Sequence, residues 1–98
     1  MRPVLHGDIA DVARALLGVS PERRAQSCRD MINEADTADR FVQTHKRMHP
    51  MWGNGSLMSA ARMRVLSREP DFDDQDYCDC VALVLAELRK WRISRTHS

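Results

Sequence analysis

Two histidines and two cysteines have the residue types that a zinc site would need. His45 and His49 stand four residues apart, so that on a helix both imidazoles would lie on one side. Cys78 and Cys80 could supply two thiolates to the same ion. However, residues two apart on a helix point about 200° away from each other, so Cys78 and Cys80 would chelate poorly. We expect structural roles for these side chains and no bound metal, with a metal site as the alternative.

The cysteines also lack the surroundings of a nucleophile. A catalytic thiolate needs a neighbouring base and positive charge, whereas Cys78 and Cys80 stand among Asp76, Asp79 and apolar residues. The carboxylates between positions 71 and 76 are typical of a solvated loop and a helix cap. The sequence has no glycine-rich phosphate loop of known form and no Ser-His-Asp pattern. We therefore expect a protein that is not an enzyme and has no cofactor.

The most unusual stretch runs from position 49 to position 58. Its two glycines flank an asparagine and precede a predicted helix start, where backbone N–H groups can bind an anion beside nearby bases. The alternative is a tight structural turn that packs its tryptophan into the core between two helices. Both interpretations can hold together. The predicted structural loop consists of Trp52, Gly53, Asn54, Gly55 and Ser56.

Charge is distributed in blocks although the net charge is only +1. No acidic residue stands between Arg40 and Arg68, and no basic residue stands between Glu69 and Asp79. Residues 89–98 contain basic residues and no acidic residue. Such blocks are typical of solvated faces, of anion binding or of contact between copies of a chain. If the bases bind DNA phosphates, the contacting residues are Lys46, Arg47, Arg62, Arg64, Arg89, Lys90, Arg92 and Arg95.

Length and composition indicate one folded domain. The chain has 98 residues, of which 43% are hydrophobic and 30% charged. Three cysteines are an odd number and form a poor disulfide framework, which favours a reducing, cytoplasmic setting. No stretch approaches the roughly 18 apolar residues of a membrane span. We expect a single helical domain over residues 1–98 with no membrane contact.

The apolar spacing predicts four helices, over residues 8–17, 21–46, 57–66 and 75–91, with a flexible tail from about 93. Ser20 and Pro21 are a strong start signal for the second helix. Ser56 or Asn54 is a candidate cap for the third, and Asp73 or Asp74 for the fourth. No window alternates for long enough to predict a strand. The fold class is therefore all-α.

The second and fourth helices have the longest apolar stripes, so we expect them to pack antiparallel as a long hairpin. The fourth also contains an unbroken apolar run from Cys80 to Ala86, broader than one short chain is expected to cover. We predict a homo-oligomer that buries part of this run. Its predicted interface consists of Val81, Leu83, Val84 and Leu88.

The chain resembles a family of short, uncharacterised bacterial proteins. The shared elements are the opening Met1-Arg2-Pro3-Val4-Leu5-x-Gly7-Asp8, the stretch His49-Pro50-x-Trp52-Gly53-Asn54-Gly55-Ser56-Leu57-Met58, and Asp76-Tyr77-Cys78-x-Cys80. Such proteins are similar to the small first product of gene transfer agent clusters, which precedes the DNA-packaging ATPase.

That likeness implies a small-terminase-like packaging adaptor. Such a protein is an all-helical oligomer that engages double-stranded DNA and recruits the large terminase ATPase. The sequence has no clear N-terminal helix-turn-helix, so sequence-specific reading of DNA is not expected. The alternative is a small helical protein-binding or regulatory module with no nucleic-acid role.

Overall fold

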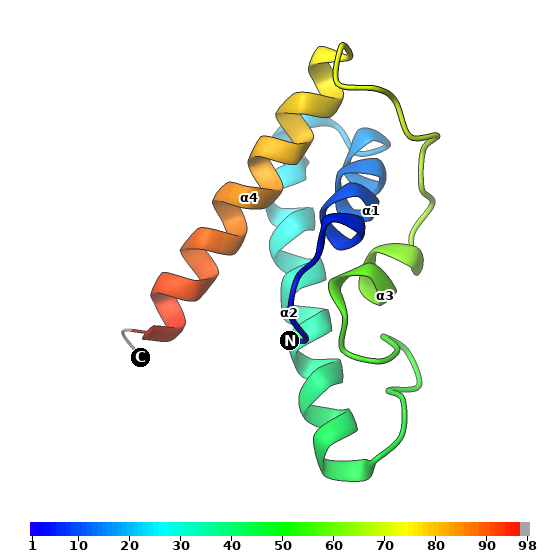
Figure 1. The fold of residues 1–98 in the computed structure, drawn as a ribbon, viewed down its shortest axis with the longest axis vertical. Helices are drawn as coiled ribbons and strands as arrows, with labels where there is room; N and C mark the ends of the chain where they lie inside the picture. Colours follow the sequence, from blue (N-terminus) through cyan, green and yellow to red (C-terminus); the bar gives the residue numbers. More distant parts are fainter. Residues whose placement is uncertain (97–98) are drawn as a thin grey trace.

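The computed structural model describes residues 1–96 and contains four helices (Figure 1). They are α1 (His6–Leu17), α2 (Pro21–His45), α3 (Leu57–Arg62) and α4 (Gln75–Thr96). The described residues contain no strand, only an isolated antiparallel bridge between His49 and Gly53. The all-α prediction is confirmed.

All four helices contribute to one apolar core. The predicted stripes of α1 and α2 face it, and α3 adds a leucine and two alanines. Cys80 is buried, because α1 and α2 together cover a wider arc of α4 than one neighbour would. The fully buried side chains include Val12, Leu16, Cys28, Met31, Ile32, Ala35, Leu57, Ala60, Ala61 and Val84.

The predicted antiparallel packing of α2 and α4 is wrong. The two helices begin at the same end of the molecule and run in the same general direction (Figure 1). Three ion pairs join them in matching order along both helices: Arg24 with Asp76, Arg29 with Glu87, and Asp36 with Arg95. The antiparallel partner of each is α1. The long segment after α3 carries the chain back to the starting end, so that α4 repeats the direction of α2 (Figure 1).

Two helix ends differ from the prediction. α3 stops at Arg62 instead of reaching residue 66, because the N–H of Ser67 donates to the carbonyl of Arg14 and draws the chain onto α1. α4 continues to Thr96 instead of ending near 91, and its last turns hold Arg95 over the ring of Trp91. The predicted flexible tail includes residues 97–98, which lie outside the described residues.

Two of the three predicted caps make a capping hydrogen bond. α2 begins at Pro21 as predicted, but the Ser20 hydroxyl makes no capping bond. Ser56 caps α3, since its side-chain oxygen accepts from the N–H of Ser59 at 3.1 Å. Asp74 caps α4 by accepting from the N–H of Tyr77 at 2.9 Å. The position of each cap follows from the sequence, whereas the bond it makes depends on the turn before it.

Candidate functional site

The loop after α2 folds back onto the end of that helix. Trp52 stacks on His49 with ring centroids 4.8 Å apart, and His49 meets the edge of Phe41 at 4.9 Å. The Nδ1 atom of His49 accepts from the backbone N–H groups of Met51 and Trp52. Trp52 is therefore a half-buried clamp on α2 and does not pack into the core between two helices, as one interpretation of the sequence expected.

The two glycines of this loop allow close contact with helices. Gly55 has a φ of +92°, and a β-carbon there would lie 2.5 Å from the Cα of Asp39 on α2. Gly53 has a φ of +80°, and its β-carbon would lie 2.9 Å from that of Ser59. Positive φ and missing space both require glycine. Gly53 and Gly55, which suggested a ligand-binding backbone, thus allow the loop to pack closely against α2 and α3.

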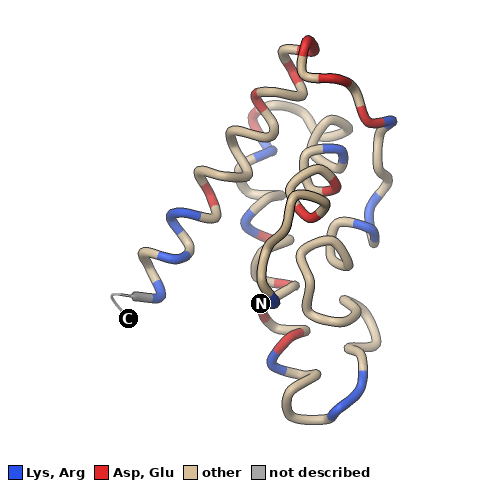
Figure 2. Tube along the Cα trace, in the orientation of Figure 1, with Lys and Arg blue, Asp and Glu red and all other residues tan. Residues whose placement is uncertain are grey.

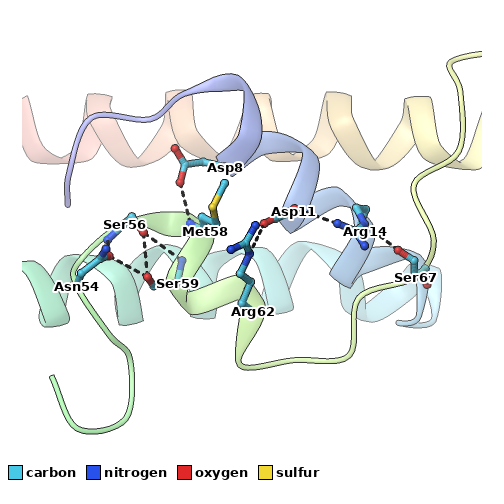
Figure 3. A network of polar contacts seen from close by, with 9 residues as sticks. All are labelled: Asp8, Asp11, Arg14, Asn54, Ser56, Met58, Ser59, Arg62 and Ser67. Carbon is cyan, nitrogen blue, oxygen red and sulfur yellow. Dashed lines mark hydrogen bonds and ion pairs between the residues drawn. The ribbon is translucent and has the colours of Figure 1, made fainter. Parts of the chain in front are cut away.

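A carboxylate of the chain itself occupies the start of α3 (Figure 3). Asp8 accepts from the N–H of Met58 at 2.8 Å, and its second oxygen accepts from the N–H of Leu5. Asn54 accepts from the N–H of Ser56 and from the hydroxyl of Ser59. These donors are bonded within the chain, so the structure does not support the predicted external anion site. The role of Asp8 could not be predicted from a local pattern, because the N–H group that it binds lies 50 residues away in the sequence.

Two of the predicted phosphate-binding arginines join helices together. Arg62 donates to Asp11 of α1 at 2.9 Å, where Arg14 also binds (Figure 3). Arg64 donates through both terminal nitrogens to Glu34 of α2, at 2.8 and 2.7 Å. The hydrogen bonds to Glu34 raise the pKa of Arg64 although burial opposes this. Both arginines stabilise the docking of α3 and its following segment.

The other predicted bases lie in three places (Figure 2). Lys46 and Arg47 are exposed at the end of α2, where Lys46 takes a left-handed conformation with a φ of 58°. Arg89 and Arg92 line a groove beside α1. Lys90 lies 3.6 Å from Glu87 of its own helix and lines a small hollow with Arg29 of α2, and Arg95 lies 3.3 Å from Asp36 of α2. The bases therefore form no continuous face.

The proposed metal ligands are not brought together. Cys78 and Cys80 lie in the first turns of α4, whereas His45 and His49 lie at the opposite end of the molecule, where α2 finishes (Figure 1). Within the part of the chain that the structure describes, no three histidine, cysteine or acidic side chains are placed to hold a metal ion. The alternative of a site with two cysteines and two histidines is wrong.

Two of the three thiols are poorly suited to nucleophilic chemistry. Burial, together with the charge of Glu87, raises the pKa of Cys28 to about 12. Burial also raises the pKa of Cys80, and Asp76 and Asp79 add to this rise against the opposing charge of Arg24. Both thiols have packing roles in the core.

The structure also shows a groove that the sequence did not predict. It has a volume of about 1010 Å³ and lies between the start of α1, the outer face of α4 and residues 69–72. Leu5, Phe72 and Leu85 are 69%, 68% and 53% exposed along it. Glu69 and Asp71 stand at one end of the groove, and Arg89 and Arg92 at the other. The four-residue spacing of Val81, Leu85 and Arg89 could have indicated that these side chains share one face of α4.

The groove changes the assignment of the predicted oligomer interface. Val84 is completely buried against its own chain, so its predicted contact with a second copy is not supported. Leu88 is nearly buried but also lines the groove, so its predicted contact stays a prediction. Val81 lines the groove, whereas Leu83 is half-buried outside it. An apolar run around a helix predicts burial but does not show which part its own chain covers.

The chain matches one known protein family. Residues 2–88 match the family described as Domain of unknown function (DUF7742). The chain belongs to this family. No curated protein and no solved structure matches it.

The DUF7742 segment contains the whole core, the loop clamped by Trp52 and the acidic end of the groove. It ends at Leu88, so the four bases from Arg89 to Arg95 lie beyond it. Among the described residues, no helix of this DUF7742 protein is both long enough and apolar enough to cross a membrane. Membership in this family assigns no activity to the chain.

Proposed function

We propose that this protein is a small-terminase-like adaptor for DNA packaging. It acts by binding, without catalysis or a cofactor: copies of the chain associate, contact double-stranded DNA without sequence preference and recruit a large terminase ATPase. The identity of the ATPase comes from the resemblance to gene transfer agent proteins. The observation that supports DNA contact is the separation of charge between the two ends of the molecule.

The acidic segment 69–79 and the bases that end α2 and α4 lie in different parts of the molecule, with further acids and bases distributed between them (Figure 2). The acidic segment 69–79 lies where α2 and α4 begin, and exposed bases lie where both helices finish. A polyanion is repelled by the first end and attracted to the second. Contact with phosphates alone fixes the orientation of a protein on DNA without reading bases, which suits a sequence with no clear N-terminal helix-turn-helix.

The geometry narrows the set of bases that should contact DNA. Arg62 and Arg64 already bind Asp11 and Glu34, so a phosphate would have to compete with those carboxylates. Lys46 and Arg47 project from the end of α2, and Arg47 lies over the ring of Phe41. We therefore assign the main DNA contact to Lys46 and Arg47, with the tail bases of α4 as a second contact.

A gel mobility-shift titration over several salt concentrations tests this assignment. Affinity should fall by about 0.9 log units per log unit of salt for each phosphate contact. Changing Lys46→Glu and Arg47→Glu together should weaken binding to all sequences alike and reduce that slope by about 1.8 if both residues bind phosphate. Helical content measured by circular dichroism should not change, since both side chains are exposed.

The matched control combines Arg23→Glu with Arg68→Glu. It changes the net charge by the same amount, but Arg23 is exposed near the start of α2 and Arg68 is exposed directly before the acidic segment. Its salt slope should stay close to that of the original protein. Equal losses in both double variants, or no shift at low salt, would remove DNA as a direct ligand.

A protein-binding module with no nucleic-acid role is the second candidate. It is favoured by the ion pairs that engage Arg62 and Arg64 and by the exposed apolar groove. The gene neighbourhood separates the two functions cheaply: a large-terminase gene directly downstream supports packaging, and its absence favours the second candidate. In the second candidate, charge reversal of Lys46 and Arg47 leaves the biological partner bound.

A further inference from the structure

We propose that the groove between α1 and α4 binds a second copy of this chain, with the two α4 helices antiparallel across a two-fold axis. This inference rests on the self-association named in the proposed function and specifies its surface and partner. It does not require DNA binding. The exposed apolar side chains of the groove and the order of charges along it favour such a contact.

The centre of the groove is apolar. Leu85 projects from α4 with about half of its surface exposed, and Val81 lies one turn before it. Leu5 and Phe72 border the same groove from the start of α1 and from the segment before α4, and both are largely exposed. Contiguous apolar side chains around a hollow of this kind are typical of a protein contact surface.

The charges are ordered along the groove. Glu69 and Asp71 stand at the end where α4 begins, and Arg89 and Arg92 stand at the end toward which α4 runs. A two-fold axis near Leu85 would set the acids of one copy opposite the arginines of the other at both ends. A parallel arrangement would instead oppose like charges. The groove is therefore complementary to itself in one orientation only.

The same order of charges disfavours other occupants. DNA or an acidic peptide would meet repulsion at Glu69 and Asp71, and a basic peptide would meet it at Arg89 and Arg92. A second copy supplies both signs in the required order together with a matching apolar centre. In this arrangement Arg89 and Arg92 serve the contact between copies, which leaves Lys46 and Arg47 as the main DNA contact.

Sedimentation of the full chain at tens of micromolar tests the contact directly. The original protein should be a dimer, and Leu85→Asp should halve its mass. Because Leu85 is half exposed, the helical content and melting cooperativity of this variant should be retained. Ala82→Asp is the matched control, since Ala82 is exposed on α4 but does not line the groove; that variant should remain a dimer.

A charge exchange tests the orientation. One variant combines Arg89→Glu with Arg92→Glu, so that both ends of its groove are acidic. The other combines Glu69→Lys with Asp71→Lys, so that both ends are basic. Each alone should sediment as a monomer, and an equimolar mixture should form a heterodimer of twice the mass, because only unlike copies are then complementary.

The contrary outcomes can be told apart. A monomeric original protein would overturn both this inference and the self-association in the proposed function, while the mobility shift would still decide DNA contact. A dimer whose mass is unchanged by Leu85→Asp and by the charge variants would overturn the groove alone. Two charge variants that stay monomeric after mixing would overturn the antiparallel orientation.

Discussion

Gly55 belongs to a glycine-rich loop of the kind that often binds ligands, but its role in this fold is structural. With no side chain, it brings the loop into direct contact with the backbone of Asp39 on α2. Asn54 and Ser56 then bond within the loop and to α3, and Trp52 holds the other side by stacking on His49. Close packing and positive φ therefore require glycine in this loop, and no external ligand is needed to explain it.

We predict that Gly55→Ala lowers the free energy of unfolding by about 2 kcal/mol or more. The new β-carbon would lie 2.5 Å from Asp39 Cα, at a φ of +92° that alanine rarely adopts. Gly18→Ala is the matched control, because Gly18 has a φ of −85° and its β-carbon would meet only a carbonyl oxygen at 3.8 Å. Chemical denaturation measures both. Equal midpoints for the two variants would contradict the close approach.

At the scale of the element, α4 has two apolar sides with different roles. One side, which includes Tyr77, Val84 and Leu88, completes the core against α1 and α2. The other, which includes Val81 and Leu85, faces the open groove. In the dimer that we propose, neighbouring residues of one apolar run would serve folding and association separately.

We predict that Val84→Asp unfolds the protein or costs about 3 kcal/mol or more, because it places a carboxylate with no partner at a completely buried position. Leu85→Asp, one residue later, should leave the melting temperature of the monomer within a few degrees. Circular dichroism melts of the two variants provide the comparison. Similar melts would show that α4 is rotated from the position described.

The helices could be predicted from the sequence because their evidence is local. Pro21 marks the start of α2, and the stripe containing Cys28 and Ile32 marks its buried face. The direction of α4 could not be predicted, because an apolar stripe is the same in either direction and the long connection permits both. Contacts such as that between Asp8 and the N–H of Met58 join distant segments, so no local pattern contained them.

The candidate site was predicted less well for a related reason. Arg62 and Arg64 form part of a base-rich block in the sequence, but each meets an acid from another helix in the fold. The groove likewise combines Leu5 and Phe72 with α4, and these come from separate parts of the chain. Both the ion pairs and the groove combine residues that are distant in the sequence, so local patterns do not predict them.

At the scale of the whole molecule, α2 and α4 are held together by ion pairs near both ends of their contact. Arg24 binds Asp76 at the start of α4 and also donates to the carbonyls of Leu16 and Val19, which links three segments. At the far end, Asp36 binds Arg95. The ionised carboxylates of Asp76 and Asp36 therefore add to the apolar core in holding α4 against α2.

We predict a loss of stability in acid. The hydrogen bond from Arg24 lowers the pKa of Asp76. Burial opposes ionisation of Asp36, but the Met1 amino group, Arg95 and Arg40 together lower its pKa. Both folded-state values thus lie below the unfolded ones, so the stabilisation is complete above about pH 4 and is lost as pH falls through the lowered values.

Urea denaturation between pH 7 and pH 2 measures this dependence. Asp76→Asn should be less stable than the original protein at pH 7, and the difference should shrink in acid as Asp76 of the original protein becomes protonated. Asp73→Asn, in the exposed segment before α4, is the control and should follow the original curve. A difference that stays constant down to pH 2 would show that the carboxylate charge of Asp76 contributes nothing.

The place of α4 in the core also bears on how the chain folds during synthesis. α4 provides Tyr77, Cys80, Val84 and Leu88 to the core, and it is the last of the four helices to be translated. Until it leaves the ribosome, α1 lacks its main partner and α2 exposes the side that α4 will cover. Translation adds about 5–20 residues per second, so the nascent apolar surfaces stay uncovered for seconds. The core is therefore completed only after α4 has been translated, and slow codons between α2 and α4 would prolong the exposure of α1 and α2 to chaperones.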